Sequence, residues 1–220
     1  MKTITVLVCD DHAMVRSGLR LLLKTATDIE VIGEAENGHQ SVRETRRLSP
    51  DVVLMDLSMP LLNGVEAARQ IVKEFPSAKV LILSAYNDDQ YIQHAVNAGA
   101  VGYLVKETAG NDLLRAVHEV AAGNAFFSPV IARRLLRQSD EMLLDGCLAR
   151  TRAATLSNRQ SEVLQLIAEG YSTKQMGDVL SLSTKTVEKH RQGLMAKLDI
   201  HNVATLTRYA VSNGVVELKL

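Results

Sequence analysis

The sequence predicts two domains: a doubly wound α/β domain with a five-stranded parallel sheet, followed by a smaller all-α domain of four helices. In the first half of the 220 residues, short apolar runs alternate with segments of helical period. After Thr155 only helical patterns remain. Charge divides the chain in the same way: residues 1–127 hold 12 Lys and Arg against 16 Asp and Glu, a net charge of −4, and residues 128–220 hold 13 against 9, a net charge of +4. We therefore expect two modules with different partners.

Five apolar runs in the first half are the strand candidates. Runs that are apolar throughout rather than alternating, such as Val52–Met55, favour strands buried on both faces of a parallel sheet. The expected strands are Thr3–Val8, Ile29–Glu34, Val52–Met55, Val80–Leu83 and Gly102–Val105. Amphipathic segments separate them, and the last expected helix of this domain, Asp112–Ala122, ends before Gly123. The pattern predicts an α/β domain at residues 1–123.

Residues 124–154 carry weaker signals. Val130–Arg137 and Glu141–Leu144 have some helical character, but no strand is evident, and the stretch is long for a connection inside one compact domain. We interpret it as a partly helical linker.

Residues 155–220 are predicted to form four short helices. Ser157 and Ser172 each precede a glutamine by three residues, the spacing of a capping box, and Ser183 offers a third N-cap. The expected helices are Asn158–Glu169, Thr173–Leu180, Thr184–Leu198 and Val203–Asn213.

Composition favours a soluble, cytoplasmic protein without a membrane partner. The apolar share of 46% is ordinary for a globular chain, and no run of 18 apolar residues or signal-peptide cleavage region is evident. The formal net charge of zero, taken over the whole chain, argues against a strong nucleic-acid signal. Cys9 and Cys147 form no disulfide framework, and Cys9, in an apolar run, is best explained as a buried thiol.

Polar residues stand at four of the expected strand ends, where ligands bind in doubly wound sheets. Asp10 and Asp11 follow the first strand, Asp56 follows the third, Ser84 ends the fourth and Lys106 ends the fifth. Converging carboxylates repel one another, and a divalent cation such as Mg²⁺ relieves that repulsion. With Lys106 as a fixed positive charge and Ser84 as a hydroxyl donor, the set suits phosphoryl transfer, with Asp56 as the nucleophile that forms an acyl phosphate. Taken singly, each residue has a structural alternative: an aspartate can cap a helix, and a lysine can be a solvated charge.

Four segments carry a family resemblance: "VCDDHAMVRSGLRLLL", "PDVVLMDLSMPLLNGVEAARQI", "VLILSAY" and "AGAVGYLVKE". They resemble the receiver domains of response regulators, which have a flavodoxin-like or CheY-like fold, over residues 1 to about 122. The resemblance implies that a sensor histidine kinase phosphorylates Asp56, and that Asp10, Asp11, Asp56 and the carbonyl of Ser58 hold Mg²⁺. It also implies that Ser84 and Tyr103 form a switch pair beside Lys106. Glu107 stands where many receivers have proline, so the usual cis-proline bond is missing.

The helix expected at Thr184–Leu198 has two distinct faces. One apolar face, at helical spacing, consists of Val187, His190, Leu194 and Leu198. The opposite, polar face consists of Lys185, Glu188, Lys189 and Gln192, with Thr186, Arg191 and Lys197 on the flanks. Such a polar face can reach base edges in a DNA groove, and its flanks can meet phosphates. A solvated helix surface with i,i+3 ion pairs is the alternative.

The segment "LSNRQSEVLQLIAEGYSTKQMGDVLSLSTKTVEKHRQGLMAKLDIHNVATLTRYAV" resembles the LuxR-type helix-turn-helix, and the whole chain is similar to the NarL/FixJ group of response regulators. The resemblance implies that Thr173–Leu180 is a positioning helix, Thr184–Leu198 a recognition helix and Glu162 a scaffold acid. Glu188 on the reading face leaves open which base is read. The implied DNA contacts are Lys174, Thr184, Lys185, Thr186, Glu188, Lys189, Arg191, Gln192 and Lys197. The modest positive charge predicts weak binding by a monomer, so a homodimer on two half-sites of duplex DNA is expected, with RNA polymerase as a further candidate partner.

The leading hypothesis is therefore a transcription regulator switched by phosphorylation, and not an enzyme. A phosphatase that works through an aspartyl phosphate is an alternative, but Ser58 stands where such an enzyme would have a second, general-acid aspartate. An adaptor whose helical domain binds a protein is the other alternative, and salt-dependent retention on duplex DNA would distinguish it.

Overall fold

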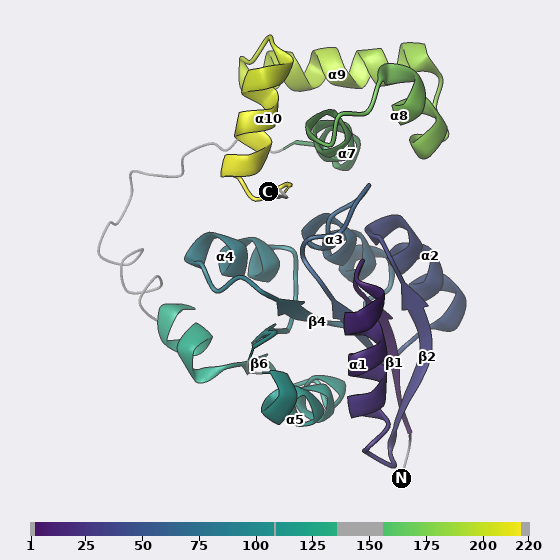
Figure 1. Cartoon of the computed structure of the whole chain (residues 1–220), viewed down its shortest axis with the longest axis vertical. Coiled ribbons are helices and arrows are strands. Elements are labelled where there is room, and N and C mark those ends of the chain that lie inside the picture. The colour runs from purple at the N-terminus through teal and green to yellow at the C-terminus, as the bar shows by residue number, and fades with distance from the viewer. Residues whose placement is uncertain (1–2, 108, 136–155, 217–220) are drawn as a thin grey trace. The chain divides into compact units, whose positions relative to one another are not determined.

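The structure is a computed structural model that describes residues 3–107, 109–135 and 156–216. The chain divides into two compact units, Met1–Leu144 and Asp145–Leu220 (Figure 1). We describe each unit by itself and call them the N-terminal and C-terminal domains.

The N-terminal domain is built on one parallel sheet with the strand order β2-β1-β3-β4-β5-β6. The strands are β1 (Ile4–Cys9), β2 (Ile29–Ala35), β3 (Val52–Met55), β4 (Lys79–Ser84), β5 (Gly102–Val105) and β6 (Phe126–Phe127). The order of the first five strands is that of flavodoxin-like folds, and it reverses between β1 and β3. The doubly wound parallel sheet predicted from the apolar runs is confirmed.

The predicted number of strands was wrong by one. Phe126 and Phe127 pair in parallel with Gly102 and Tyr103, so the sheet continues into the range 124–154 that the sequence suggested as a linker. A strand of two residues is too short to show a period in the sequence, and the pairing with β5 decides its conformation.

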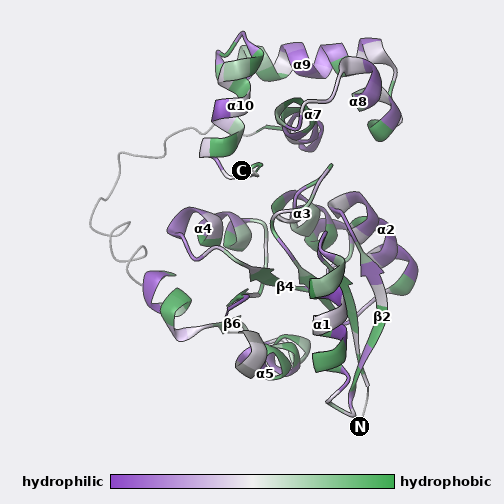
Figure 2. Cartoon of the chain, viewed as in Figure 1, coloured by the Kyte–Doolittle hydropathy of each residue, from purple (hydrophilic) through white to green (hydrophobic). Residues whose placement is uncertain are grey.

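Helices cover both faces of the sheet (Figure 1). They are α1 (Ala13–Leu23), α2 (Gly38–Leu48), α3 (Gly64–Glu74), α4 (Asp89–Asn97) and α5 (Ala109–Ala121). One core lies between the sheet and the helices α2, α3 and α4, and includes Met55, Ile71 and Ile92. The other lies between the sheet and the helices α1 and α5, and includes Leu54, Leu23 and Val117. Because successive residues of a strand point to opposite faces, the central strand β3 is buried on both faces and is apolar throughout. The edge strand β2 also carries the polar residues Glu30 and Glu34, and its colours are mixed in Figure 2.

The C-terminal domain consists, in its described residues, of the four expected helices. They are α7 (Asn158–Ala168), α8 (Thr173–Leu180), α9 (Thr184–Leu198) and α10 (Val203–Ser212). Helix α7 packs against α9 and α10, and α8 packs against α9. The predicted caps are confirmed: Ser157 and Ser172 form capping boxes with Gln160 and Gln175, and Ser183 caps α9.

The turn between α8 and α9 is tight. Helix α8 ends at Leu180, and the next residue, Ser181, caps it in the left-handed conformation at φ 56°. A Cβ atom on Gly177 would lie 2.8 Å from the carbonyl oxygen of Leu182, so glycine allows the chain to turn back over the end of α8.

Part of the suggested linker is helical. Residues 129–135 are helical and Ile131 is fully buried in the core shared with α4. Residues 136–137 of the candidate helix Val130–Arg137, and all of Glu141–Leu144, lie outside the described residues. Among the described residues, none of the helices has the length and hydropathy needed to cross a bilayer.

Candidate functional site: an acidic pocket and a polar helix face

The carboxyl ends of four strands bring the predicted polar residues to one edge of the sheet. Asp10 directly follows β1, Asp56 follows β3, Ser84 ends β4 and Lys106 follows β5. Strands β1 and β3 are neighbours at the point where the strand order reverses, and the backbone N–H of Asp56 donates to the carbonyl oxygen of Cys9 at 2.8 Å. The two aspartates therefore stand side by side at the switch point of the sheet.

Lys106 joins these two carboxylates. Its Nζ lies 2.7 Å from Oδ2 of Asp10 and 3.0 Å from Oδ2 of Asp56. Asp10 is 1% exposed and Asp56 is 4% exposed. Asp11, which is more exposed, completes a cluster with Asp10, His12 and Asp56, in which one potential ligand atom of each residue lies within 4.8 Å of the others. We call the residues Asp10, Asp11, Asp56 and Lys106 the acidic pocket.

Burial and neighbouring charges shift the pKa values of Asp56 and Lys106. Loss of solvent raises the pKa of Asp56 from 3.8 to about 6; Lys106 opposes this shift, and the charge of Asp10 adds to it. Burial lowers the pKa of Lys106, but the carboxylates of Asp56 and Asp10 outweigh that effect and raise it overall. The pocket is short of positive charge, because one ammonium faces three carboxyl groups, and hard oxygen donors of this kind suit a divalent cation.

The loop after β3 is held close to Asp56. A Cβ atom on Gly64, the first residue of α3, would lie 1.8 Å from the carbonyl oxygen of Asp56, so only glycine fits there. The N–H of Gly64 donates to the carbonyl of Leu57 at 2.8 Å, and Leu61 adopts a positive φ of 69°. Ser58 is half-buried in this loop, two residues beyond Asp56.

Ser84 and Tyr103 lie beside the pocket on neighbouring strands. Both side chains are buried, the backbone N–H of Tyr86 donates to Oγ of Ser84 at 3.1 Å, and the Tyr103 hydroxyl donates to the carbonyl of Tyr86 at 2.7 Å. Burial raises the pKa of Tyr103 to about 12, which keeps its hydroxyl protonated as a donor. The loop after β4 thus contacts both members of the expected switch pair.

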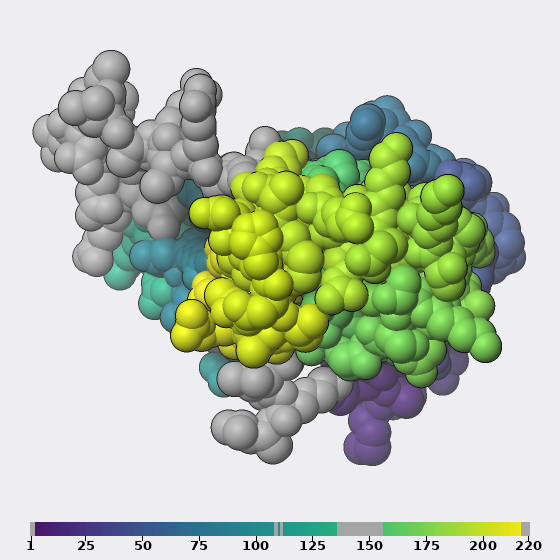
Figure 3. Space-filling view, turned by 90° about the horizontal axis from the view of Figure 1, so that it is seen from above, coloured from purple at the N-terminus to yellow at the C-terminus, as the bar shows by residue number. Residues whose placement is uncertain are grey.

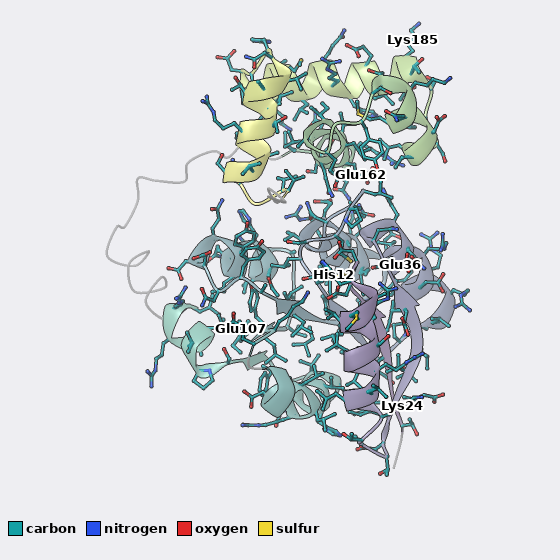
Figure 4. The ribbon with its side chains drawn as sticks, viewed as in Figure 1. His12, Lys24, Glu36, Glu107, Glu162 and Lys185 are labelled. Carbon is teal, nitrogen blue, oxygen red and sulfur yellow. The ribbon has the colours of Figure 1, made fainter. Side chains whose placement is uncertain are left out.

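Sequence reasoning missed two residues next to the pocket. His12 places Nδ1 2.8 Å from Oδ1 of Asp11, at the N-terminal end of α1 (Figure 4). Arg16 is buried and its Nη1 donates to the backbone carbonyl of Asp10 at 2.7 Å. A signal for Arg16 existed: it stands seven residues before the buried Leu23, on the apolar stripe of α1, where a charged residue is unexpected.

Asp10 makes a local contact as well as its contact to the lysine of the pocket. Its Oδ1 accepts from the backbone N–H of His12 at 2.8 Å. His12 is the N-cap of α1 and α1 has no side-chain cap, so Asp10 does not fill the capping role considered from the sequence. Oδ2 of the same carboxylate faces Lys106, so Asp10 holds the loop after β1 and pairs with the lysine at the same time.

The C-terminal domain presents a polar helix face. On α9, Val187 and Leu194 are buried in the domain, whereas Lys185, Lys189 and Gln192 are exposed on the other side. Figure 3 views the domain from the side of α9, and Lys185 projects away from the domain in Figure 4. We call the exposed side the polar face of α9.

The other residues expected to contact DNA divide into two groups. Lys174, Thr184 and Lys197 are exposed. Thr186, Glu188 and Arg191 are half-buried and make local contacts: Oγ1 of Thr186 lies 2.8 Å from Oγ of Ser183, and Nη1 of Arg191 lies 3.8 Å from Oε2 of Glu188. Glu162, the expected scaffold acid, is buried in α7 and pairs with Nη1 of Arg159 at 2.6 Å.

Two family models match the chain, one on each domain. The model described as "Response regulator receiver domain" matches residues 6–118. The model described as "Bacterial regulatory proteins, luxR family" matches residues 154–210. The first therefore includes the acidic pocket and the second includes α7, α8 and α9.

Relatives match this chain over nearly all of its length and nearly all of their own. The chain is 33% identical to the transcriptional regulatory protein DegU of Brevibacillus brevis, over 98% of this chain and 96% of that protein. It is 34% identical to the response regulator protein VraR of Staphylococcus aureus, over 98% of this chain and 100% of that protein. Among solved structures, the RcsB response regulator of Salmonella typhimurium is similar with a TM-score of 0.62 and 27% identity, over 97% of this chain and 99% of that chain.

Proposed function

Because the chain belongs to the two-component response regulators that join a receiver domain to a LuxR-type DNA-binding domain, we propose that Asp56 is its phosphoacceptor. Phosphorylation of Asp56 by a sensor histidine kinase then controls dimerisation and sequence-specific binding of duplex DNA. The observation that carries the proposal is the pairing of the buried Asp56 carboxylate with Lys106 at 3.0 Å, beside Asp10 and at the switch point of the sheet.

The transfer step requires little more than positioning and charge. One carboxylate oxygen of Asp56 forms a bond to phosphorus while the P–N bond to the donor imidazole breaks, and the electron pair stays on that nitrogen. Lys106, whose raised pKa keeps it protonated, offers its positive charge to the phosphoryl oxygens. Ser58 offers no general acid at the position where a phosphatase would need one, so we infer that the acyl phosphate is a signal and that the protein turns over no small substrate.

The acidic pocket fits a magnesium ion. The carboxylates of Asp10, Asp11 and Asp56 supply hard oxygen donors within 4.8 Å of one another, and the carbonyl of Ser58 is the proposed fourth protein ligand. When bound, the cation neutralises the charge of the carboxylates and of the phosphoryl group. In the protein itself, Lys106 already holds Asp10 and Asp56 in place for such an ion.

The output of the switch is proposed to begin at Ser84 and Tyr103. Ser84 would donate its hydroxyl hydrogen to a phosphoryl oxygen while its Oγ still accepts from the N–H of Tyr86, so the loop after β4 would move with the serine. Because the Tyr103 hydroxyl is bonded to the carbonyl of the same Tyr86, a movement of this loop toward the phosphoryl group displaces the tyrosine as well. The serine and the tyrosine are in this way coupled through one residue.

DNA binding is proposed to use the polar face of α9 in a homodimer. Lys185, Lys189 and Gln192 are exposed on that face and suit base edges in the major groove, and the exposed Lys174, Thr184 and Lys197 suit phosphates. RcsB has been solved as dimers bound to DNA. A dimer doubles the charge and the number of half-sites that this weakly basic domain presents. We infer that the protein acts in the bacterial cytoplasm, where DNA and RNA polymerase are found.

Labelling of the chain tests the proposed phosphoacceptor. The full-length protein is incubated with ³²P-labelled acetyl phosphate and Mg²⁺, and hydroxylamine is added to release acyl phosphate. We expect Asp56→Asn to lose all hydroxylamine-sensitive label, and removal of the metal with EDTA to have the same effect. Asp88→Asn is the matched control, because Asp88 is an exposed carboxylate at the start of α4. Label that persists in Asp56→Asn would place the acceptor elsewhere.

Selection of bound duplexes from a random DNA pool tests whether phosphorylation controls sequence-specific DNA binding. Phosphorylated wild-type protein is expected to enrich one sequence, arranged as two half-sites, that the unphosphorylated protein and the Asp56→Asn variant enrich poorly. Equal enrichment by all three proteins would separate DNA binding from the phosphorylation of Asp56.

A further inference from the structure

Arg16 is a buried cation that holds the backbone beside the acidic pocket. It is 7% exposed, and three of its nitrogens have an acceptor. Nη1 donates to the carbonyl oxygen of Asp10 at 2.7 Å, Nε to Oε2 of Glu34 at 3.1 Å and Nη2 to Oε1 of Glu36 at 2.7 Å. Glu34 lies near the end of β2 and Glu36 just beyond it (Figure 4 labels Glu36). Arg16 thus ties the loop after β1 to the end of the neighbouring strand.

The carbonyl that Arg16 contacts belongs to the peptide plane between Asp10 and Asp11. Because this plane is rigid, the direction of its carbonyl is tied to two backbone angles, ψ of Asp10 and φ of Asp11, and these angles set how the two residues are turned relative to one another. The other polar atoms of Asp10 are held elsewhere: its N–H donates to Ala35 at 3.0 Å, Oδ1 accepts from His12 and Oδ2 accepts from Lys106. Arg16 supplies the contact to the remaining atom, the carbonyl oxygen.

We propose that Arg16 is a positioning residue for the metal, which fixes the orientation of the Asp10 and Asp11 carboxylates without touching the ion or the phosphoryl group. The inference rests on the proposed function of Asp10, Asp11 and Asp56 as metal ligands. A planar guanidinium can bond three acceptors in fixed directions, whereas a lysine ammonium at the same place cannot match this geometry. Glu34 and Glu36 balance the charge of Arg16 locally. Arg16 therefore acts on the pocket mainly by orienting its carboxylates and not by its charge.

Arg20 provides a matched control on the same helix. Its Nη1 lies 3.4 Å from Oε1 of Glu34, the carboxylate that Arg16 also contacts, but Arg20 is half-exposed and lies one helical turn farther from Asp10. Arg20→Ala removes a positive charge and a contact to Glu34 and leaves the Asp10–Asp11 peptide held by Arg16.

Metal affinity is the direct readout. Mn²⁺ serves as the probe, because it suits the same oxygen ligands as Mg²⁺ and its free form gives an electron paramagnetic resonance signal that is lost on binding. In the full-length protein, we expect Arg16→Ala to weaken Mn²⁺ binding by about 10- to 100-fold, as when other partners that orient metal ligands are removed. Arg16→Lys is expected to recover only part of this loss, and Arg20→Ala to bind Mn²⁺ nearly as wild type does.

Chemical rescue separates positioning from general damage to the fold. Millimolar guanidinium ion is expected to restore part of the Mn²⁺ affinity of Arg16→Ala, whereas methylammonium at the same concentration is not. If Arg16→Ala fails to fold, Glu36→Gln is the second test, because the Glu36 side chain is 63% exposed and its replacement removes only one acceptor of the guanidinium. Glu36→Gln should weaken Mn²⁺ binding in the same direction by a smaller factor.

Two results would overturn the inference. One is wild-type Mn²⁺ affinity in folded Arg16→Ala or Arg16→Lys, and the other is a loss no greater than that in Arg20→Ala. Asp11→Asn distinguishes this failure from failure of the proposed function. If Asp11→Asn also binds Mn²⁺ like wild type, the metal site itself is wrong and the role of Arg16 falls with it; if Asp11→Asn binds weakly, only the role of Arg16 is refuted.

Discussion

The acidic pocket and the polar face of α9 are both sets of charged and polar residues, but they differ in burial and in the pairing of their charges. In the pocket, Asp10 and Asp56 are nearly inaccessible to solvent and share the ammonium of Lys106. On α9, Lys185 and Lys189 point into solvent, and the backbone beneath them is an ordinary helix. The pocket holds its charges before any ligand arrives, whereas the helix face leaves its charges free for a partner.

This contrast predicts what residue replacements change in each domain. A buried charge must be paired or neutralised, so neighbouring backbone and side chains are fixed around it and each replacement disturbs several contacts. An exposed charge contributes little to the stability of the fold. Its replacement therefore weakens binding of the partner and leaves the domain folded. Three predictions test this contrast, in order of decreasing effect.

Glycine replacement compares the backbone around the two sites. In Gly64→Ala the new Cβ would lie 1.8 Å from the carbonyl of Asp56, whereas in Gly177→Ala it would lie 2.8 Å from the carbonyl of Leu182. We expect a loss of more than about 3 kcal/mol in the free energy of unfolding for Gly64→Ala and of about 1–3 kcal/mol for Gly177→Ala. Urea unfolding followed by circular dichroism measures both.

Gly18→Ala is the control for that comparison. A Cβ there meets no atom within 4 Å, and the residue is inside α1, so alanine should stabilise the protein by about 0.5–1 kcal/mol. Equal losses in Gly64→Ala and Gly177→Ala would contradict the idea that the backbone is held more tightly at the pocket.

Asp56→Asn tests the cost of the buried charge in metal-free buffer. The pKa of Asp56 is about 6 in the folded protein against 3.8 as its ordinary value, so the folded state holds this proton more tightly. The wild type therefore loses stability as the pH rises from about 4 to about 6, and this loss is complete above pH 6. Asp56→Asn removes the penalty and should be more stable than wild type at pH 7 by up to about 3 kcal/mol, with no such gain below pH 4.

Urea midpoints of the wild type and of Asp56→Asn at pH 4, 5, 6 and 7, with EDTA present, measure the effect. Asp88→Asn reports what removal of an exposed carboxylate does under the same conditions. A difference between wild type and Asp56→Asn that stayed constant over the four pH values would show that the charge of Asp56 carries no such cost.

Lys189→Ala and Gln192→Ala test the polar face of α9. Each should weaken specific DNA binding by about 1–3 kcal/mol, while the free energy of unfolding changes by less than about 0.5 kcal/mol. If Lys189 meets a phosphate, its loss should lower the salt dependence of binding; the loss of Gln192 should instead relax base preference. Titrations of the selected duplex at several salt concentrations measure these effects.

Lys24→Ala is the charge-matched control for Lys189→Ala, because Lys24 is an exposed lysine at the end of α1 in the other domain (Figure 4). Unchanged footprints for Lys189→Ala and Gln192→Ala would mean that DNA contacts another surface.

The helices and strands were largely predictable because their signals are local. Apolar runs gave β3 and β5 with both ends correct, and serine caps gave α8 and α9 in the same way. A capping box needs residues only three positions apart, and a buried strand shows itself in four consecutive apolar residues. Strand β6 was not predicted, because its two residues are too few to show a hydrophobic period.

The chemical character of the pocket also followed from the sequence. Since parallel strands end at one edge of the sheet, Asp10, Asp56, Ser84 and Lys106 were expected to lie together, and the structure brings them together. Arg16 was missed because an arginine on a helix is usually solvated, and only the packing of α1 against the end of β2 makes it a buried partner of Asp10.

Patterns among near neighbours in the chain were enough to predict most helices and strands, their order, and the charged residues at the strand ends. The tertiary structure alone decided which charges are buried, which carbonyl Arg16 holds and how closely Gly64 approaches Asp56. Those outcomes depend on contacts such as that between Lys106 and Asp10, 96 positions apart. Such a contact forms only when the chain folds, and its energy depends on distances and burial that no local sequence pattern encodes.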